Sequence, residues 1–347
     1  MTITRMRAEI AEQPAALRRT LDALLPAVPE IARLAERTRQ VLFIARGSSD
    51  NAATYGRYLI EAHAGRLATP AAPSIATAYR RRIDLTGVLA VAISQSGKTE
   101  EIVETLGWAA DCGARTVAIT NGAASLLADA ADLALITEAG DEEAVPATKT
   151  YSTQLAALAV LALGLGADVD PDDLRRVPDE ADRLIEQTSA SPALAAMVAE
   201  LAPVSGTVVS GRGIAFGTAL ELALKLKEAC YLHAMGLSYA DLLHGPIAVV
   251  DPRTPAILVA AEEGPTLPGT VALARRVTGA GARAYGIGGG ADLAEVCAHT
   301  LPGPRLPEWA APLGLIVPGQ VLVEALARAL GLNPDLPRGL NKVTQTD

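Results

Sequence analysis

The stretch Ser94-Gln95-Ser96-Gly97-Lys98-Thr99 follows an apolar run, Val88-Leu89-Ala90-Val91-Ala92-Ile93, and precedes Glu100-Glu101-Ile102-Val103-Glu104-Thr105-Leu106. The apolar run predicts a buried strand, and the two leading glutamates predict the first turn of a helix. Unpaired backbone N–H groups give a helix start a partial positive charge, hydroxyl groups add hydrogen-bond donors, and a glycine lets a ligand approach the backbone closely. A strand, a hydroxyl-rich loop and a helix in this order form a phosphate-binding arrangement.

Two other interpretations of this stretch are open. Thr99 followed by acidic residues is also a good helix N-cap, although capping alone does not account for three hydroxyls around a glycine. Gly97-Lys98-Thr99 resembles the end of a P-loop, but that motif needs a glycine where this chain has Ala92. We therefore reject a nucleoside-triphosphate site and expect another phosphorylated ligand.

The composition excludes several classes of protein. The chain has 347 residues, of which 50% are hydrophobic and 3% aromatic, and a net charge of −9. This length predicts about two domains with real cores. The acidic charge and the scarcity of aromatic residues argue against a nucleic-acid partner. Phosphate must therefore be held by local dipoles, hydroxyls and a few lysines.

The cysteines and the terminal sequence predict a cytoplasmic location. Cys112, Cys230 and Cys297 are widely separated, show no zinc-ligand spacing, and are interpreted as buried thiols in a reducing compartment. We expect no metal and no cofactor. The longest apolar run, Leu155 to Ala167, is too short to span a bilayer, and residues 1–12 lack the apolar core of a signal peptide. We expect no membrane partner.

The chain repeats itself with an offset of 166 to 168 residues. Val41-Leu42-Phe43-Ile44-Ala45-Arg46-Gly47 resembles the segment 207–213, and Gly113-Ala114-Arg115 resembles Gly281-Ala282-Arg283. Two anchors with nearly equal offsets indicate a duplicated domain. The second copy lacks the phosphate loop, because the offset of 166 pairs Ser96 with Glu262, whose carboxylate would repel phosphate. We expect one phosphate site per chain.

Each copy alternates short apolar strands with helical patterns, which predicts an α/β fold with a parallel sheet between helices. Strands are expected near residues 41–45, 88–93, 115–120 and 133–137, and again near 206–210, 256–261 and 283–288. The predicted organisation is an N-terminal helical segment (1–30), a phosphate-binding domain (31–167), a helical linker (168–200), a second domain (201–333) and a C-terminal tail (334–347).

A second candidate site lies in the second copy. Gly211-Arg212-Gly213 with Gly217 is a weak match to a dinucleotide fingerprint, because its spacing is wrong and no acidic residue follows at the expected distance. The helix expected after it, residues 214–232, is mostly apolar, and its charged residues include Lys225 and Glu228. A carboxylate beside apolar surface suits general acid/base catalysis, whereas a solvated ion pair is the alternative. From the sequence pattern alone, His244 is interpreted as a structural residue and the C-terminal tail as disordered.

Together these motifs resemble the tandem SIS (sugar isomerase) family, and are most similar to the isomerase half of glucosamine-6-phosphate synthase and its stand-alone relatives. The resemblance covers nearly the whole chain. It rests on Glu9-x-x-x-Gln13-Pro14, Arg46-Gly47-Ser48-Ser49, Ser94-Gln95-Ser96-Gly97-Lys98-Thr99, Ala139-Gly140-x-Glu142, Thr148-Lys149, Ala223-Leu224-Lys225-Leu226-Lys227-Glu228, His244-Gly245-Pro246 and Lys342.

The resemblance implies two flavodoxin-like domains of three layers and a set of expected site residues. The sugar phosphate and its hydroxyls would be held by Gly47, Ser48, Ser49, Ser94, Gln95, Ser96 and Thr99, with backbone contacts from Val145 and Ala147. Glu228 would transfer the proton between C1 and C2, with Lys225 beside it. His244 would assist ring opening, from a partner subunit of a homodimer, and Lys342 would form a Schiff base with a ketose phosphate in a tail that covers the site.

The chain departs from the synthase in one decisive respect: the sequence starts at the isomerase region, without the glutaminase domain and its cysteine nucleophile. Arg46 and Lys98 also stand where the synthase has cysteine and glutamate. We therefore expect the deaminase direction, from glucosamine 6-phosphate to fructose 6-phosphate and ammonia. The alternatives are a fructosamine-phosphate deglycase, another aldose–ketose phosphosugar isomerase, and a non-catalytic sugar-phosphate sensor.

Overall fold

The computed structural model describes residues 3–342, which fold into two compact units. The first-sheet unit comprises Ala15–Glu142, Lys149–Arg175 and the described residues from Asn341 on. The second-sheet unit comprises the described residues up to Pro14, Glu143–Thr148 and Arg176–Leu340. Of the predicted tail, residues 343–347 lie outside the described part of the chain.

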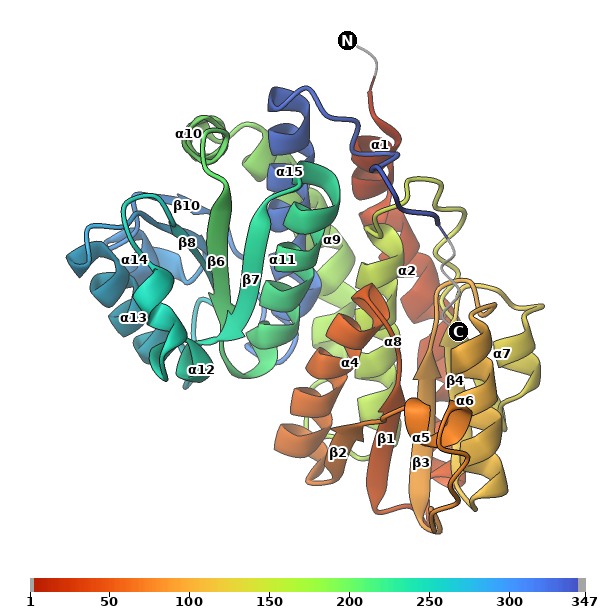
Figure 1. The fold of residues 1–347 in the computed structure, drawn as a ribbon. Coiled ribbons are helices and arrows are strands. Elements are labelled where there is room, and N and C mark those ends of the chain that lie inside the picture. Colours follow the sequence, from red (N-terminus) through yellow and green to blue (C-terminus); the bar gives the residue numbers. More distant parts are fainter. Residues whose placement is uncertain (1–2, 343–347) are drawn as a thin grey trace. The chain divides into compact units, whose positions relative to one another are not determined.

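The first-sheet unit is built on five parallel strands in the order β2-β1-β3-β4-β5 (Figure 1). Their bounds are β1 Gln40–Ile44, β2 Leu67–Pro70, β3 Val88–Ile93, β4 Arg115–Thr120 and β5 Leu133–Ile136. The register pairs Phe43 with Val91 and Val91 with Val117. The strands that the sequence predicts here are confirmed within one residue, and β2 is an additional strand at the edge.

Helices cover both faces of this sheet. The longer ones are α2 Gln13–Leu24, α3 Val28–Leu34, α4 Ser48–Leu59, α6 Glu100–Asp111 and α8 Lys149–Gly164, and the short ones are α5 Ser74–Thr77 and α7 Leu126–Asp129. On one face Ala90 and Ala92 form a core with Ile102 and Leu106 of α6. α4 packs on α8, where a Cβ at Gly56 would lie 2.8 Å from Leu158 Cδ2. Small residues thus let helices approach closely in a chain with few aromatics.

The second-sheet unit repeats the same design. Its parallel sheet has the order β10-β9-β8-β6-β7, which read from the β7 edge is the same succession of second, first, third, fourth and fifth strands. The bounds are β6 Gly206–Gly211, β7 His233–Ser238, β8 Ala256–Ala260, β9 Ala284–Gly288 and β10 His299–Leu301. This identical topology confirms the two-domain α/β fold and explains the sequence repeat.

The helices of this unit are α1 Arg5–Ala11, α9 Asp172–Ser189, α10 Pro192–Leu201, α11 Phe216–Cys230, α12 Tyr239–Leu243, α13 Leu267–Gly279, α14 Gly290–Ala294 and α15 Pro312–Ala329. One face of the sheet packs on α11 and α15, through residues such as Ile257 and Leu322, and the other packs on α13 through Leu258 and Ala274. Within the described residues α15 is the one helix long and apolar enough to cross a membrane, but 83% of it is buried, as in the core helix of a globular unit.

Candidate functional site

The loop 94–99 leaves the carboxyl end of β3 and enters α6 at Thr99, as the sequence predicts. Its backbone is fixed from both sides. Ser94 N–H donates to Ile119 O at 3.1 Å, and Gln95 O accepts Asn121 N–H at 3.1 Å. Ser96 Oγ accepts Lys98 N–H at 3.2 Å. Thr99 has the extended backbone of an N-cap, but its side chain makes no capping hydrogen bond, so capping alone does not explain this threonine.

Gly97 is required by this geometry. Its φ is +62°, in the left-handed region, and a Cβ at this position would lie 2.3 Å from Ser125 Oγ. The close approach brings the loop against Ser125, the N-cap of α7, whose Oγ accepts Ala128 N–H. The loop is therefore preorganised by packing as well as by hydrogen bonds.

Ser48 and Ser49 form the start of α4, directly after the turn that leaves the neighbouring strand β1. Ser48 is the first residue of α4, which follows β1, and Gly47 before it has a φ of +58°. β1 pairs with β3, with Ile44 opposite Ala92, while β2 lies on the other side of β1. This is the topological switch point of the sheet, the position where such folds bind ligands. Two 12-residue helices begin there, so two positive helix ends favour an anion.

Arg46 lies close to these helix starts. Its guanidinium Nη2 pairs with Glu101 Oε1 at 2.9 Å, and its side chain is half exposed. Burial raises the pKa of Asp50, although the charges of Arg46 and Arg57 oppose the shift. Glu101 thus partly neutralises the positive charge of Arg46 beside this loop.

Lys342 belongs to the same unit as the phosphate loop, where it contacts Glu142. Lys342 Nζ lies 2.8 Å from Glu142 Oε2, and the Glu142 side chain is fully buried. Glu142 also accepts from Thr150, through its N–H at 3.1 Å and its hydroxyl at 2.6 Å. The carboxylate therefore stabilises the first turn of α8 and fixes the lysine amine. Sequence reasoning quoted Glu142 only as part of a motif and did not assign this role.

Val145 and Ala147 lie on the segment Glu143–Thr148 of the second-sheet unit. Val145 N–H already donates to Asp335 O at 2.9 Å. Glu9 of α1 accepts the N–H groups that start the segment, and Gln320 of α15 donates to Thr148 O at 3.2 Å. Three separate parts of the unit thus hold this segment in place. Glu9, from the motif near the start of the chain, therefore acts by holding the segment Glu143–Thr148 in place.

α11 carries the charged residues predicted for acid/base chemistry on one face. Glu221, Lys225 and Glu228 follow at spacings of four and three. The Lys225 side chain is 1% exposed; its Nζ lies 3.5 Å from Glu221 Oε1 and makes a closer ion pair with Glu228. Glu221 is fully buried, whereas Glu228 is 21% exposed. A solvated ion pair is excluded for Lys225, and the partly exposed Glu228 is the carboxylate that a substrate can reach.

Glu221 is the member of this cluster that sequence reasoning did not select. The sequence spacing could have indicated that Glu221 belongs to this cluster, because residues 221, 225 and 228 share one helix face. The structure brings these three side chains together within the second-sheet unit. It also brings Lys342 and Glu142 together within the first-sheet unit.

His244 follows α12 and is exposed. Its backbone N–H donates to Asp241 O at 3.1 Å, and Gly245 after it has a φ of +131°. Among residues 3–342 no side-chain hydrogen bond involves its ring. The imidazole is therefore available for a ligand or another subunit, and its catalytic role stays a prediction.

No group of three or more His, Cys, Asp and Glu side chains within the described part of the chain is arranged to hold a metal ion.

The comparisons with known proteins agree with this architecture. A family model described as the SIS domain matches residues 34–164. A candidate phosphosugar isomerase from Silicibacter pomeroyi DSS-3 superposes with a TM-score of 0.87 at 34% identity, over 96% of this chain and 100% of that one. The chain belongs to the SIS family, and its repeated fold makes it a tandem member.

Two relatives define the branch that it resembles. The glutamine–fructose-6-phosphate aminotransferase (isomerizing) of Methanothermobacter thermautotrophicus is 36% identical over 97% of this chain, which spans 56% of that protein. The C-terminal domain of the aminotransferase from Francisella tularensis superposes with a TM-score of 0.85 at 27% identity, covering 97% of this chain and 99% of that one. A glucosamine-6-phosphate deaminase from Thermotoga maritima shares the fold, with a TM-score of 0.78 at 24% identity over 99% of this chain and 100% of that one.

Proposed function

We propose that the chain is a ketol isomerase of sugar phosphates that acts on glucosamine 6-phosphate, giving fructose 6-phosphate and ammonia. The observation that carries the proposal is the face of α11, where a buried lysine contacts a partly exposed carboxylate. The hydroxyl loop at the switch point of the first sheet supplies a place for the phosphate. The relatives named for fructose 6-phosphate support the choice of sugar.

In the proposed reaction His244 assists opening of the sugar ring. Glu228 then takes the proton from C2, giving an enolamine, and returns it to C1. The resulting C2 imine is hydrolysed by one water, which releases ammonia and leaves fructose 6-phosphate. The ammonium of Lys225 stabilises negative charge that develops during enolisation, in a site of low polarity. We assign Lys342 to contact the ketose, as a Schiff base or through its hydroxyls.

The three cysteines of this chain are buried thiols. In the resembling synthase, a cysteine nucleophile takes nitrogen from glutamine. Here Cys112, Cys230 and Cys297 are all buried, and burial raises the pKa of Cys230 and of Cys297 to about 12. Free, buried thiols support our proposal of a cytoplasmic location.

The direct test is incubation of the purified chain with glucosamine 6-phosphate, followed by measurement of ammonia and fructose 6-phosphate. Equal amounts of both products are expected. A panel with fructosamine 6-phosphate and tagatose 6-phosphate tests the deglycase and isomerase alternatives. Absence of both products at high enzyme concentration contradicts the deaminase proposal, and phosphate-sugar binding without turnover of any panel member would favour the sensor.

We also propose a homodimer in which His244 serves the site of the partner, because its exposed ring has no hydrogen bond within the described chain. Mixing inactive His244→Ala and Glu228→Gln variants under conditions of subunit exchange should restore activity. A monomer in solution, or a mixture that stays as inactive as its components, contradicts this arrangement.

A further inference from the structure

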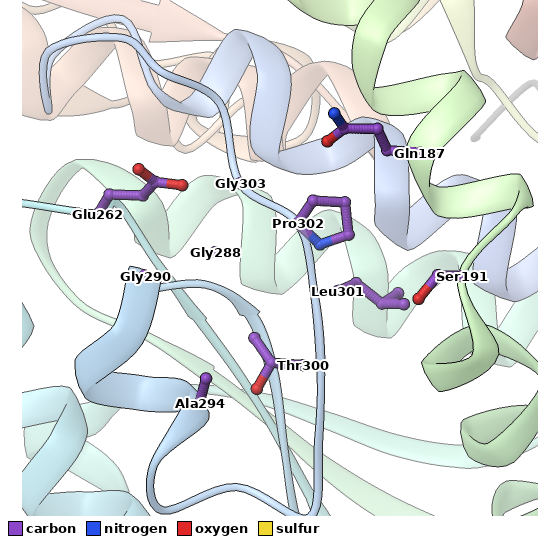
Figure 2. Close-up of a pocket in the computed structure, with 10 residues that line it drawn as sticks. All are labelled: Gln187, Ser191, Glu262, Gly288, Gly290, Ala294, Thr300, Leu301, Pro302 and Gly303. Atoms are coloured by element: carbon purple, nitrogen blue, oxygen red, sulfur yellow. The ribbon is translucent and has the colours of Figure 1, made fainter.

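A cavity of about 410 Å³ lies at the carboxyl edge of the second sheet, within the second-sheet unit. It is formed by the loops that follow β8, β9 and β10 and by the end of α9 (Figure 2). The volume falls at the small end of the range of roughly 300–1,000 Å³ for small-molecule sites. Ligands of open α/β sheets bind at this edge. The cavity therefore has the place and the size of a site for one monosaccharide.

The cavity lies beside the loop that follows β8, the counterpart of the phosphate loop after β3, but on the β9 and β10 side of β8 and not at the β6–β8 switch point. The offset of the sequence repeat places Glu262 where the first copy has Ser96. The local packing is also alike. A Cβ at Gly122, after β4, would lie 3.2 Å from Ser96 O, and a Cβ at Gly290, after β9, would lie 3.8 Å from Glu262 Cβ. In the second copy, the loop after the third strand of the sheet thus carries a carboxylate where the first copy has a hydroxyl.

Glycines keep the carboxylate accessible. A Cβ at Gly303 would lie 3.4 Å from Glu262 Oε1 and 2.7 Å from Gly288 Cα. Any larger residue there would fill the space in front of the carboxylate. The backbone at Gly303 is held in place by Arg183, whose Nη2 donates to Gly303 O at 2.7 Å.

The lining is polar and carries a single charge. Glu262 is the one charged side chain among the residues that line the cavity, and in the view of Figure 2 the segment through Pro302 and Gly303 runs between it and Gln187. The nearby Arg183 is paired with Glu180, and donates to Gln187 Oε1 at 2.5 Å. Thr300, also in the lining, has a buried Oγ1 without a hydrogen-bond partner in the described chain. A negative, hydroxyl- and amide-lined cavity repels phosphate and attracts a cation that carries hydroxyls.

We propose that this cavity binds a phosphate-free amino sugar in its ammonium form. The Glu262 carboxylate accepts hydrogen bonds from the ammonium group, while Gln187 and Ser191 bind sugar hydroxyls. The site is separate from the residues assigned to catalysis, and its existence does not depend on the reaction proposed above.

The test is calorimetric titration of the full chain with glucosamine, glucose and inorganic phosphate as probes. Glucosamine should bind, and glucose should bind far more weakly. Inorganic phosphate is expected to bind at the loop 94–99, so Glu262→Gln should leave its titration unchanged. Glu262→Gln should weaken glucosamine binding by about tenfold or more, since hydrogen bonds to charged groups are the strong ones. Glu263→Gln is the matched control, because Glu263 is the exposed neighbouring carboxylate and does not line the cavity. Ser96→Ala, which alters the phosphate loop, should leave glucosamine binding intact.

Three results would overturn the proposal. Glucosamine binding that is absent in the unaltered chain removes the site. Binding that survives Glu262→Gln, or that Glu263→Gln weakens equally, assigns the ligand elsewhere. Equal affinity for glucose and glucosamine removes the role of the ammonium group. Turnover of glucosamine 6-phosphate, measured on the same samples, reports on the proposed reaction independently.

Discussion

Replacement of Lys225 by Met tests the buried charge cluster of α11. The Lys225 and Glu221 side chains are 1% and 0% exposed, and Lys225 also pairs with Glu228. The substitution keeps a long apolar stem but removes the cation that both carboxylates contact. Breaking a buried ion pair by removing one partner costs about 3–5 kcal/mol, because it leaves a buried charge poorly compensated. This is a large part of a typical folding stability of roughly 5–15 kcal/mol.

Urea denaturation followed by circular dichroism measures the effect on the unit that contains α11. Lys227→Met is the control, because Lys227 is exposed on the same helix and its loss should change stability by no more than about 0.5 kcal/mol. The double variant Glu221→Gln/Lys225→Met should recover much of the stability, since it also removes the buried carboxylate charge. If Lys225→Met is as stable as Lys227→Met, the cluster is not the buried ion network described here.

Gly97→Ala should abolish glucosamine 6-phosphate binding in calorimetry while the secondary structure stays intact, because the new Cβ would lie 2.3 Å from Ser125 Oγ at a φ of +62°; unchanged affinity would remove the loop from the site. Glu142→Gln should speed tryptic cleavage after Lys342 by about tenfold or more, because a charge-assisted hydrogen bond that restrains the lysine is weakened. Mass spectrometry detects the released peptide, and an unchanged cleavage rate would show that Glu142 does not anchor the tail.

The sequence was sufficient for the central strands of both sheets, because each contains consecutive Val, Ile, Leu, Ala or Phe residues that are buried on both faces. The strands that it did not predict, β2, β7 and β10, all lie at sheet edges. Edge strands need less apolar surface, and His233–Ser238 mixes polar and small residues. No local pattern distinguishes such a segment from a loop, so its pairing with β6 depends on tertiary structure.

Those parts of the candidate site that depend on local sequence could also be predicted. The hydroxyl loop and the pair Lys225 and Glu228 follow from local spacing, because a helix start and a helix face are local features. The partnership of Glu142 with Lys342 joins residues 200 positions apart. Only the folded chain brings such residues together, which is why the anchor of Lys342 was not predicted. Within the predicted helical linker (168–200), α9 runs from Asp172 to Ser189 and continues past Pro178.

Exchange of the substrate C1 and C2 hydrogens with solvent deuterium is the most direct test of the central claim, that Glu228 transfers the proton. Proton NMR of glucosamine 6-phosphate or fructose 6-phosphate in D₂O follows the exchange with the unaltered chain and with Glu228→Gln. General acid/base catalysis contributes about 10²–10⁴-fold, so Glu228→Gln should slow the exchange by that factor while calorimetry shows retained binding. Exchange at a near-normal rate in Glu228→Gln would contradict the account and assign the base to another residue.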